Sequence, residues 1–221
     1  MMPRRLIGLL LVMSFLLGAC ASGPVPPDWQ INVQGSTERA VAAYLTGRTR
    51  IEQAEFARSR AEIAQTGQAD LMARLELVYC ATRVASLVVE DCSGFAGLSQ
   101  DAGRAERAYA DYLAGQVAAQ DVSLLPPSHR GAVTGGVQSL IAISDPLSRL
   151  VAAGVMFKLG RADPAVMALA VDTASAQGWS RPLLAWLHLQ AQRAELAGQT
   201  EDAGRLRRRI ALVLQTPTRV P

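Results

Sequence analysis

The C-terminal part of this 221-residue chain carries a regular series of signals that start and stop helices, and this series limits the fold more than any other feature. Each start has a side chain that can accept a hydrogen bond from a free backbone N–H, and two starts are followed by proline, which favours the first helical turn. Glycine, which often ends a helix, follows the first three predicted helices. The start signals are Asp145-Pro146, Asp163-Pro164, Ser180 and Thr200, and the stop signals are Gly160, Gly178 and Gly198. We therefore expect successive helices joined by short turns.

The start signals also recur at a regular distance. Ser180 lies 35 residues after Asp145, and Thr200 lies 37 residues after Asp163. This spacing resembles that of tetratricopeptide repeats, whose period is about 34 residues, although the tryptophan, tyrosine and proline signature of those repeats is missing. The resemblance implies stacked helical hairpins, either a tetratricopeptide-like α-solenoid or a helical bundle, with a surface for a protein partner.

The composition extends the helical prediction to the N-terminal part. Alanine and leucine are abundant and aromatic residues make up 5% of the chain, which favours helices over strands. Gly131 and Gly135 of the connector and Ser139 just after it either share a closely packed helical face or belong to a loop weakened by glycine. The predicted segments are an N-terminal helical region at 36–120, a loop or connector at 121–136, a C-terminal helical-repeat region at 137–215 and a tail at 216–221. The chain is thus expected to be all-α.

The first residues have the zones of an export signal. Two arginines precede an apolar run at residues 6–17, which is shorter than the about 20 residues that a transmembrane helix needs. The run ends in Leu17-Gly18-Ala19-Cys20, which resembles the lipobox of bacterial lipoproteins. The resemblance implies that residues 1–19 are a signal peptide and that Cys20 carries lipid after cleavage and anchors the protein in a membrane. An ordinary signal peptide with a chance cysteine is the alternative.

The residues after the anchor refine this prediction. In well-studied Gram-negative lipoproteins, an aspartate directly after the lipidated cysteine resembles a retention signal for the inner membrane. Here that residue is Ala21, which implies the periplasmic face of the outer membrane. Residues 20–35 are rich in proline and are expected to form an extended tether. Three apolar residues of this segment either dock on the domain or form a short edge strand: Trp29, Ile31 and Val33.

Two further cysteines, Cys80 and Cys92, remain after the anchor. In the oxidising compartment that export implies, an isolated pair is expected to form a disulfide. The bridge would close a loop of about 13 residues and stabilise the fold by roughly 3 kcal/mol. Two free thiols are the alternative. A metal site is not expected, because the chain has only two histidines and neither is near these cysteines in sequence.

The chain carries no catalytic motif that we recognise, so we predict neither catalytic residues nor a cofactor, and we expect a protein that is not an enzyme. His129, in Pro-Pro-Ser-His-Arg, is expected to be a solvated loop residue. His188, two residues after the expected core residue Trp186, is expected to have a structural or groove role. The arginine-rich segment 205–209 either binds an acidic group or complements a helix dipole. Without the signal arginines the net charge of +3 falls to about +1, which does not favour nucleic acid as a partner.

The most specific surface prediction is a polar stripe on the third C-terminal helix. His188, Gln192 and Glu195 are spaced four and three residues apart, and Phe157 and Lys158 are expected to face them from the preceding hairpin. The stripe either binds a partner peptide or is the solvated side of its helix. The leading expectation is a membrane-anchored, non-enzymatic adaptor that holds a protein partner in the envelope. The alternatives are a structural envelope lipoprotein without a discrete ligand and an enzyme without a recognisable motif.

Overall fold

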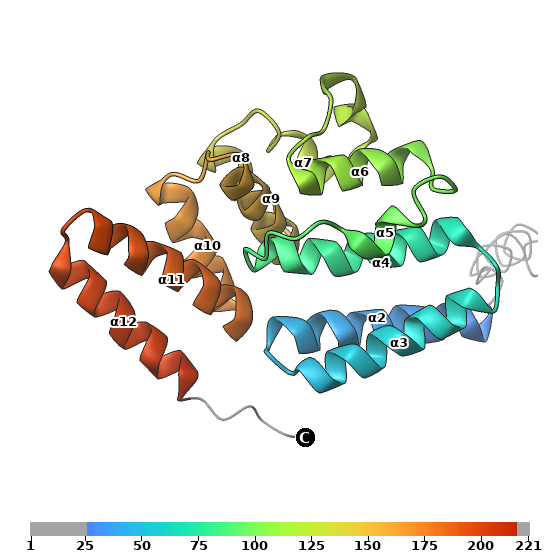
Figure 1. Ribbon diagram of the computed structural model, residues 1–221, viewed down its shortest axis with the longest axis horizontal. Coiled ribbons are helices and arrows are strands. Elements are labelled where there is room, and N and C mark those ends of the chain that lie inside the picture. Colours follow the sequence, from blue (N-terminus) through green and yellow to red (C-terminus); the bar gives the residue numbers. More distant parts are fainter. Residues whose placement is uncertain (1–25, 216–221) are drawn as a thin grey trace, which may run out of the picture.

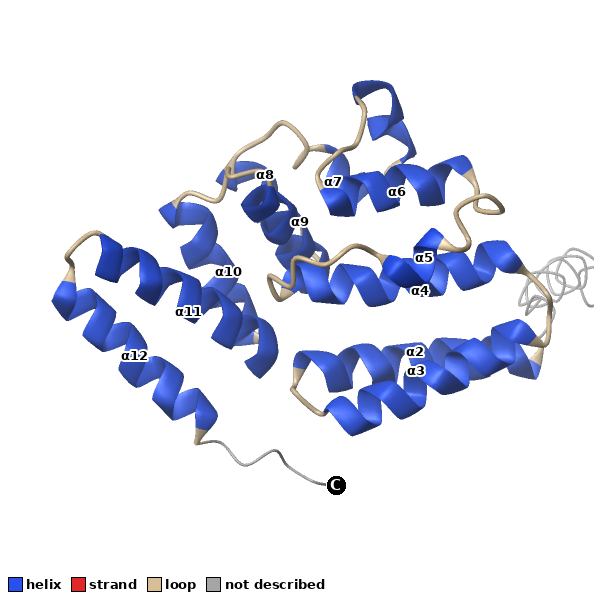
Figure 2. Cartoon of the chain, in the orientation of Figure 1, coloured by secondary structure: helices blue, strands red, loops and turns tan. Residues whose placement is uncertain are grey.

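The computed structural model of the chain describes residues 26–215. These residues form α-helices and one 3-10 helix and contain no strand (Figure 1, Figure 2), which confirms the predicted all-α fold. No helix within 26–215 is long and apolar enough to cross a membrane. The predicted signal peptide, Cys20 and the tail lie outside the described residues. In chain order the elements are α2 (Asp28–Leu45), α3 (Thr49–Ala64), α4 (Ala69–Ala85), α5 (Ser93–Ala96), α6 (Arg104–Ala114), η1 (Ala119–Leu124), α7 (Pro127–Arg130), α8 (Val137–Ile141), α9 (Pro146–Lys158), α10 (Pro164–Ala176), α11 (Ser180–Leu196) and α12 (Thr200–Leu214).

Helix α2 begins at Asp28, which corrects the prediction of an extended tether up to residue 35. Pro27 is extended and directly precedes the first turn, and the Asp28 carboxylate is favourable at the positive end of a helix. Trp29, Ile31 and Val33 are therefore helical, and none of them forms an edge strand. The sequence contains a helical pattern at this point, because Trp29 and Val33 are four residues apart and lie on the same side of a helix.

Helix α4 lies in the middle of the molecule and contacts α2, α3, α5, α6 and α9 (Figure 1). Its contact with α9 is close at Gly154, where a Cβ atom would overlap the carbonyl group of Val84. A residue without a side chain is required at this crossing because the two backbones leave no room for one.

The main apolar core joins α4, α6 and the helices from α9 to α12. Trp186 of α11 is fully buried, as predicted, and its Nε1 donates a hydrogen bond to the carbonyl oxygen of Ala85 at 3.1 Å. The ring of Phe157 meets Trp186 edge-on, with the ring centroids 6.4 Å apart. The buried residues of α2 and α3, including Tyr44 and Ile63, do not belong to this core. The N-terminal hairpin therefore has separate packing.

Two of the four predicted helix caps are confirmed. The Asp145 side chain accepts from the backbone N–H of Ser148 at 2.7 Å, and the Asp163 side chain accepts from that of Val166 at 2.8 Å. The other two are wrong by one position: Ser180 and Thr200 are the first residues of α11 and α12, and neither helix has a side-chain cap hydrogen bond. A residue inside the first turn no longer occupies the capping position.

The predicted connector is partly helical. It includes most of η1 and all of α7, and α7 starts with Pro127 in its first turn. Gly131 lies in a turn after α7 and Gly135 in the irregular segment before α8, so the alternative of one closely packed helix through Ser139 is wrong. A Cβ atom at Gly135 would overlap the carbonyl oxygen of Gly131 and the side chain of Ser139.

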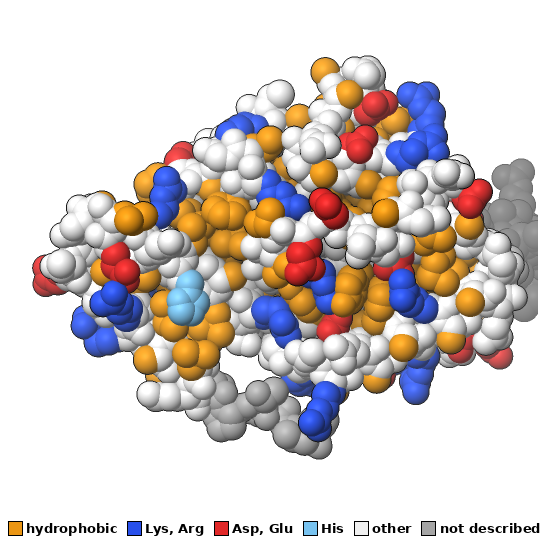
Figure 3. Space-filling view, in the orientation of Figure 1, with side chains coloured by type: hydrophobic (Ala, Val, Ile, Leu, Met, Phe, Trp, Pro, Cys, Tyr) orange, Lys and Arg blue, Asp and Glu red, His pale blue; other side chains and the backbone are white. Residues whose placement is uncertain are grey.

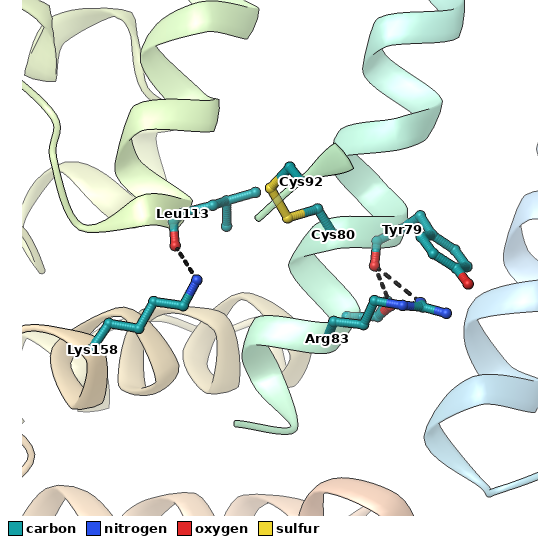
Figure 4. The surroundings of a disulfide bond; sticks show 7 residues. Tyr79, Cys80, Arg83, Cys92, Leu113 and Lys158 are labelled. Atoms are coloured by element: carbon teal, nitrogen blue, oxygen red, sulfur yellow. Dashed lines mark hydrogen bonds between the residues drawn. A yellow bond between two sulfur atoms is a disulfide. The ribbon is translucent and has the colours of Figure 1, made fainter. Parts of the chain in front are cut away.

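Cys80 of α4 and Cys92, just before α5, form the predicted disulfide (Figure 4). Their Cα atoms are 5.4 Å apart. The bridge ties the loop after α4 back along that helix. Leu87 in this loop has a φ of 59°, and it is the one residue other than glycine with positive φ in the described part of the chain. Its partly buried side chain packs on the main core, which holds it in this unfavourable backbone conformation.

Candidate binding grooves along α4

Helix α4 presents an apolar stripe that its neighbours cover only in part, since Leu75 is 4% exposed but Val78 is 37% exposed. Leu71, Leu75 and Val78 are four and three residues apart and therefore lie on the same side of the helix, together with Arg74. Two open grooves meet along this stripe, and Arg74 and Val78 line both of them. We call them the α2–α4 groove and the α4–α6 groove.

The α2–α4 groove has a volume of about 400 Å³. Trp29 and Val33 from α2, Ile63 from α3, and Leu71 and Leu75 from α4 form its floor and walls. Almost all of the exposed lining is apolar. The groove exists because α2 packs mainly on α3, so the space between its first turns and α4 is left unfilled.

The polar residues at the edge of this groove are engaged with one another. Gln34 donates a hydrogen bond to Glu38 at 3.0 Å, both on α2. On α4, the Nε of Arg74 forms an ion pair with Glu106 of α6 at 2.7 Å. This pair lies where the two grooves meet. The α2–α4 groove therefore offers an apolar ligand few polar groups to displace.

The α4–α6 groove has a volume of about 420 Å³ and a more varied lining. Val78, Tyr109 and Leu124 supply apolar surface, and Pro126 and Pro127 form part of the wall. Charged groups are also present along this groove: Arg74, Glu106 and Arg130. Apolar surface with charged side chains of both signs suits an amphipathic peptide or helix.

The α2–α3 hairpin is fastened to α4 by arginine. The guanidinium of Arg83 lies over the Tyr79 ring, 3.0 Å from its centroid, and 4.7 Å from the centroid of Tyr44 on α2. Its Nη2 also bonds the buried carboxylate of Glu52 on α3 at 3.2 Å. Arg83 thus joins α2, α3 and α4 by one ion pair and two cation–π contacts, and Figure 4 shows it extended beside Tyr79.

A polar cleft of about 350 Å³ lies next to this arginine and the disulfide. Arg60 of α3 forms an ion pair with Glu76 of α4, whose carboxylate is buried against Gly94. Glu90 and Asp91 of the disulfide loop complete the lining. Figure 3 shows acidic and basic side chains side by side over the centre of this face. The Arg60–Glu76 and Arg83–Glu52 ion pairs account for the polar lining of the cleft. Both pairs attach the α2–α3 hairpin to α4.

His129 is not the solvated loop residue that the sequence predicts. Its side chain is 2% exposed, and its Nδ1 lies 3.2 Å from the hydroxyl group of Tyr112. The rings of Tyr109 and Tyr112 pack against it. Burial lowers the pKa of His129 to about 4, and the negative charge of Asp145 acts in the opposite direction. Burial also raises the pKa of both tyrosines. The prediction failed because α7, a single helical turn that begins at Pro127, turns this ring inward.

The predicted polar stripe is only partly assembled. His188 and Gln192 are exposed on α11, and Glu195 forms an ion pair with Arg207 of α12 at 2.7 Å. Phe157 and Lys158 do not join them. Phe157 packs on Trp186 in the core, as described above.

Lys158 points toward the end of α6 instead. Its Nζ donates to the carbonyl oxygen of Leu113 at 3.0 Å (Figure 4). Partial burial lowers the pKa of Lys158, while the charge of Asp91 acts in the opposite direction. A free carbonyl at a helix C-terminus is a favourable partner for a cation. Lys158 therefore binds the end of α6 and does not belong to the predicted stripe.

Within residues 26–215, no group of three or more histidine, cysteine or acidic side chains is arranged to hold a metal ion. Comparison with protein-family models, curated proteins and solved structures finds no significant match to this chain.

Proposed function

We propose that this chain is a lipid-anchored protein of the bacterial envelope that acts as a non-enzymatic helical adaptor and binds a protein partner in the α4–α6 groove. The anchor is Cys20 in the lipobox-like segment, at the periplasmic face of the outer membrane. The observation that carries the binding proposal is the α4–α6 groove, because it joins an apolar floor to charged residues on one open surface.

The chemistry of this groove defines the partner. An amphipathic helix satisfies its own backbone hydrogen bonds, and its apolar face can cover Val78, Tyr109 and Leu124. An acidic residue beside that face would meet Arg130, whose side chain is exposed. The tetratricopeptide-like spacing supports the same class of function, because helical hairpins of that kind present extended protein-binding surfaces.

The test uses a photoactivatable benzophenone amino acid in the full-length protein, within intact cells. Ala105 is exposed and lines the α4–α6 groove, so the probe at this position should form a discrete adduct with a partner protein. The substitution Leu124→Asp should reduce the adduct at least fivefold. Leu196→Asp is the matched control, because Leu196 is 83% exposed and far from this groove.

A second probe position distinguishes the adaptor from its rivals. Gln192 lies on the exposed face of α11, so a partner adduct from Gln192 but not from Ala105 would move the binding site to the predicted stripe. A structural envelope protein without a ligand predicts no specific adduct from either position. The anchor is tested separately: radiolabelled palmitate should enter the wild-type chain and not the Cys20→Ser variant.

A further inference from the structure

We propose that the α2–α4 groove binds a fatty acyl chain, and that this chain is the one carried by the protein's own Cys20. The inference rests on the lipid anchor proposed above and adds a place for part of that anchor on the folded domain. It concerns a different groove from the one assigned to the protein partner.

The lining of the groove selects the class of ligand. The exposed surface contributed by Trp29, Val33 and Leu71 is nearly free of polar atoms, in contrast with the charged α4–α6 groove. Covering this surface with a ligand that has hydrogen-bonding groups would leave those groups without partners, which is unfavourable. A saturated acyl chain has no such groups. The volume of about 400 Å³ is also within the range of roughly 300–1,000 Å³ that is usual for small-molecule sites.

The position of the groove selects the source of the acyl chain. Trp29, which lines it, is the second residue of α2, so the covalent path from the lipidated residue ends at the mouth of the groove. Eight residue steps separate Cys20 from Asp28, and an extended chain spans at most about 3.6 Å per residue. The point at which the lipid is attached therefore stays within roughly 30 Å of Asp28. This tethering gives the protein's own acyl chain a much higher effective concentration than a free lipid would have.

The packing of α2 gives the occupied groove a structural effect. The buried residues of α2 and α3 lie outside the main core, and the space between α2 and α4 is the unfilled part of their interface. An acyl chain in that space would supply apolar contacts to both helices. Lipidation should therefore slow hydrogen exchange in α2 and leave exchange in α11 unchanged, when wild-type protein is compared with Cys20→Ser.

The deciding experiment places a photoreactive group on the lipid itself. Cells are fed a fatty acid that carries a diazirine, membranes are irradiated, and the monomeric full-length protein is digested with trypsin. After reduction of the Cys80–Cys92 disulfide, cleavage after Arg60, Arg74 and Arg83 gives peptides 61–74 and 75–83, which carry the α4 side of the groove. We expect the lipid on the peptide that begins at Cys20 to be crosslinked to one of these two peptides.

Matched variants show whether the groove holds the lipid. Val33→Gln and Leu71→Gln change residues of the α2–α4 groove only, and each should lower the crosslink yield at least fivefold while the circular dichroism spectrum stays helical. Leu196→Gln, on an exposed position of α11, should leave the yield unchanged.

The outcomes separate this inference from the proposed function. If the wild-type protein incorporates no fatty acid, the proposed anchor is wrong and the inference falls with it. If Cys20 is lipidated but its acyl chain crosslinks to phospholipid or to another protein, the anchor stands and the groove assignment is overturned. Equal yields from wild type and both groove variants would overturn it as well.

Discussion

The α2–α3 hairpin and the α11–α12 hairpin have similar lengths but are attached to the molecule in different ways. Helix α11 inserts Trp186 and Leu187, both fully buried, into the main core. The α2–α3 hairpin is joined to α4 through Arg83, through the Arg60–Glu76 pair and through stacked rings of Phe56 and Tyr79, 4.3 Å apart.

This difference has a consequence for motion. Apolar burial scales with area and is lost only when the core opens. The N-terminal hairpin is held mainly by polar and aromatic contacts, those with α4 and those of Arg181 of α11 with Tyr44 and Thr49, and such contacts can separate locally. The C-terminal hairpin should therefore unfold with the main core. The N-terminal hairpin, which leads to the proposed anchor, can open while the core stays folded. The predictions below test this difference, in order of their expected effect on global stability.

The largest effect is expected from Trp186→Ala. The substitution removes a fully buried ring and leaves the carbonyl of Ala85 without its donor, so the free energy of unfolding should fall by about 3–5 kcal/mol. Urea denaturation followed by circular dichroism measures this. Trp179→Ala, at a partly buried position before α11, is the control and should cost much less. Equal losses from the two variants would show that the ring of Trp186 is not central to the core.

The second prediction concerns the disulfide. Cys92→Ala should lower the free energy of unfolding by roughly 3 kcal/mol, because the bridge restricts the unfolded chain. The measurement is thermal melting of the wild-type and variant proteins without reductant. Adding a reductant should bring the wild-type melting temperature close to that of the variant and leave the variant unchanged. If neither the substitution nor the reductant changes the melting temperature, the bridge contributes no stability.

The sequence was sufficient to predict what depends on local order. The all-α class, the caps at Asp145 and Asp163, and the Cys80–Cys92 bridge follow from patterns within a few turns of the chain. The grooves along α4 could not be predicted in this way. The spacing of Leu71, Leu75 and Val78 indicates an apolar face, but only the tertiary packing leaves part of that face open to solvent.

The same limit explains the errors in the predicted site. The predicted stripe assumed that Phe157 and Lys158 face α11 as surface residues, and the fold uses both for packing and helix termination. His129 has loop-like neighbours in sequence, and its burial depends on two tyrosines of α6 that lie 17 and 20 residues earlier. Side-chain environment is set by such distant contacts, whereas caps and turns are set by neighbours in the chain.

The third prediction is a pH dependence from His129. Its folded pKa of about 4 lies below its ordinary value of 6.5, so below about pH 6.5 the unfolded chain binds a proton that the folded protein does not. The stability contributed by the neutral ring is complete above pH 6.5 and is lost as the pH falls toward 4. Between pH 7 and pH 5 the loss should be about 2 kcal/mol.

The variant His129→Phe isolates this contribution. It removes the titrating ring and the contact with Tyr112, so it lowers stability by a constant amount but should flatten the profile between pH 7 and pH 5. Urea midpoints at several pH values measure both effects, and other groups that titrate in this range contribute equally to the two proteins. Parallel profiles for wild type and variant would contradict a buried, neutral His129.

The smallest global effect, and the sharpest test of the comparison, is expected from Arg83→Met. This change removes the partner of the Glu52 carboxylate, whose side chain is 4% exposed, the cation over Tyr79, and one of the two cations over Tyr44; the other, Arg181, remains. Because Arg83 is partly exposed, we expect the local opening free energy of α2 and α3 to fall by roughly 1–3 kcal/mol. Native-state hydrogen exchange should show this loss in α2 and α3, with α9 and α11 still protected and the global urea midpoint shifted little.

Glu52→Gln combined with Arg83→Met should recover part of the loss, since the unpaired buried carboxylate is then gone. If exchange instead rises uniformly from α2 to α12, the two hairpins form one cooperative unit and the proposed difference between them is wrong.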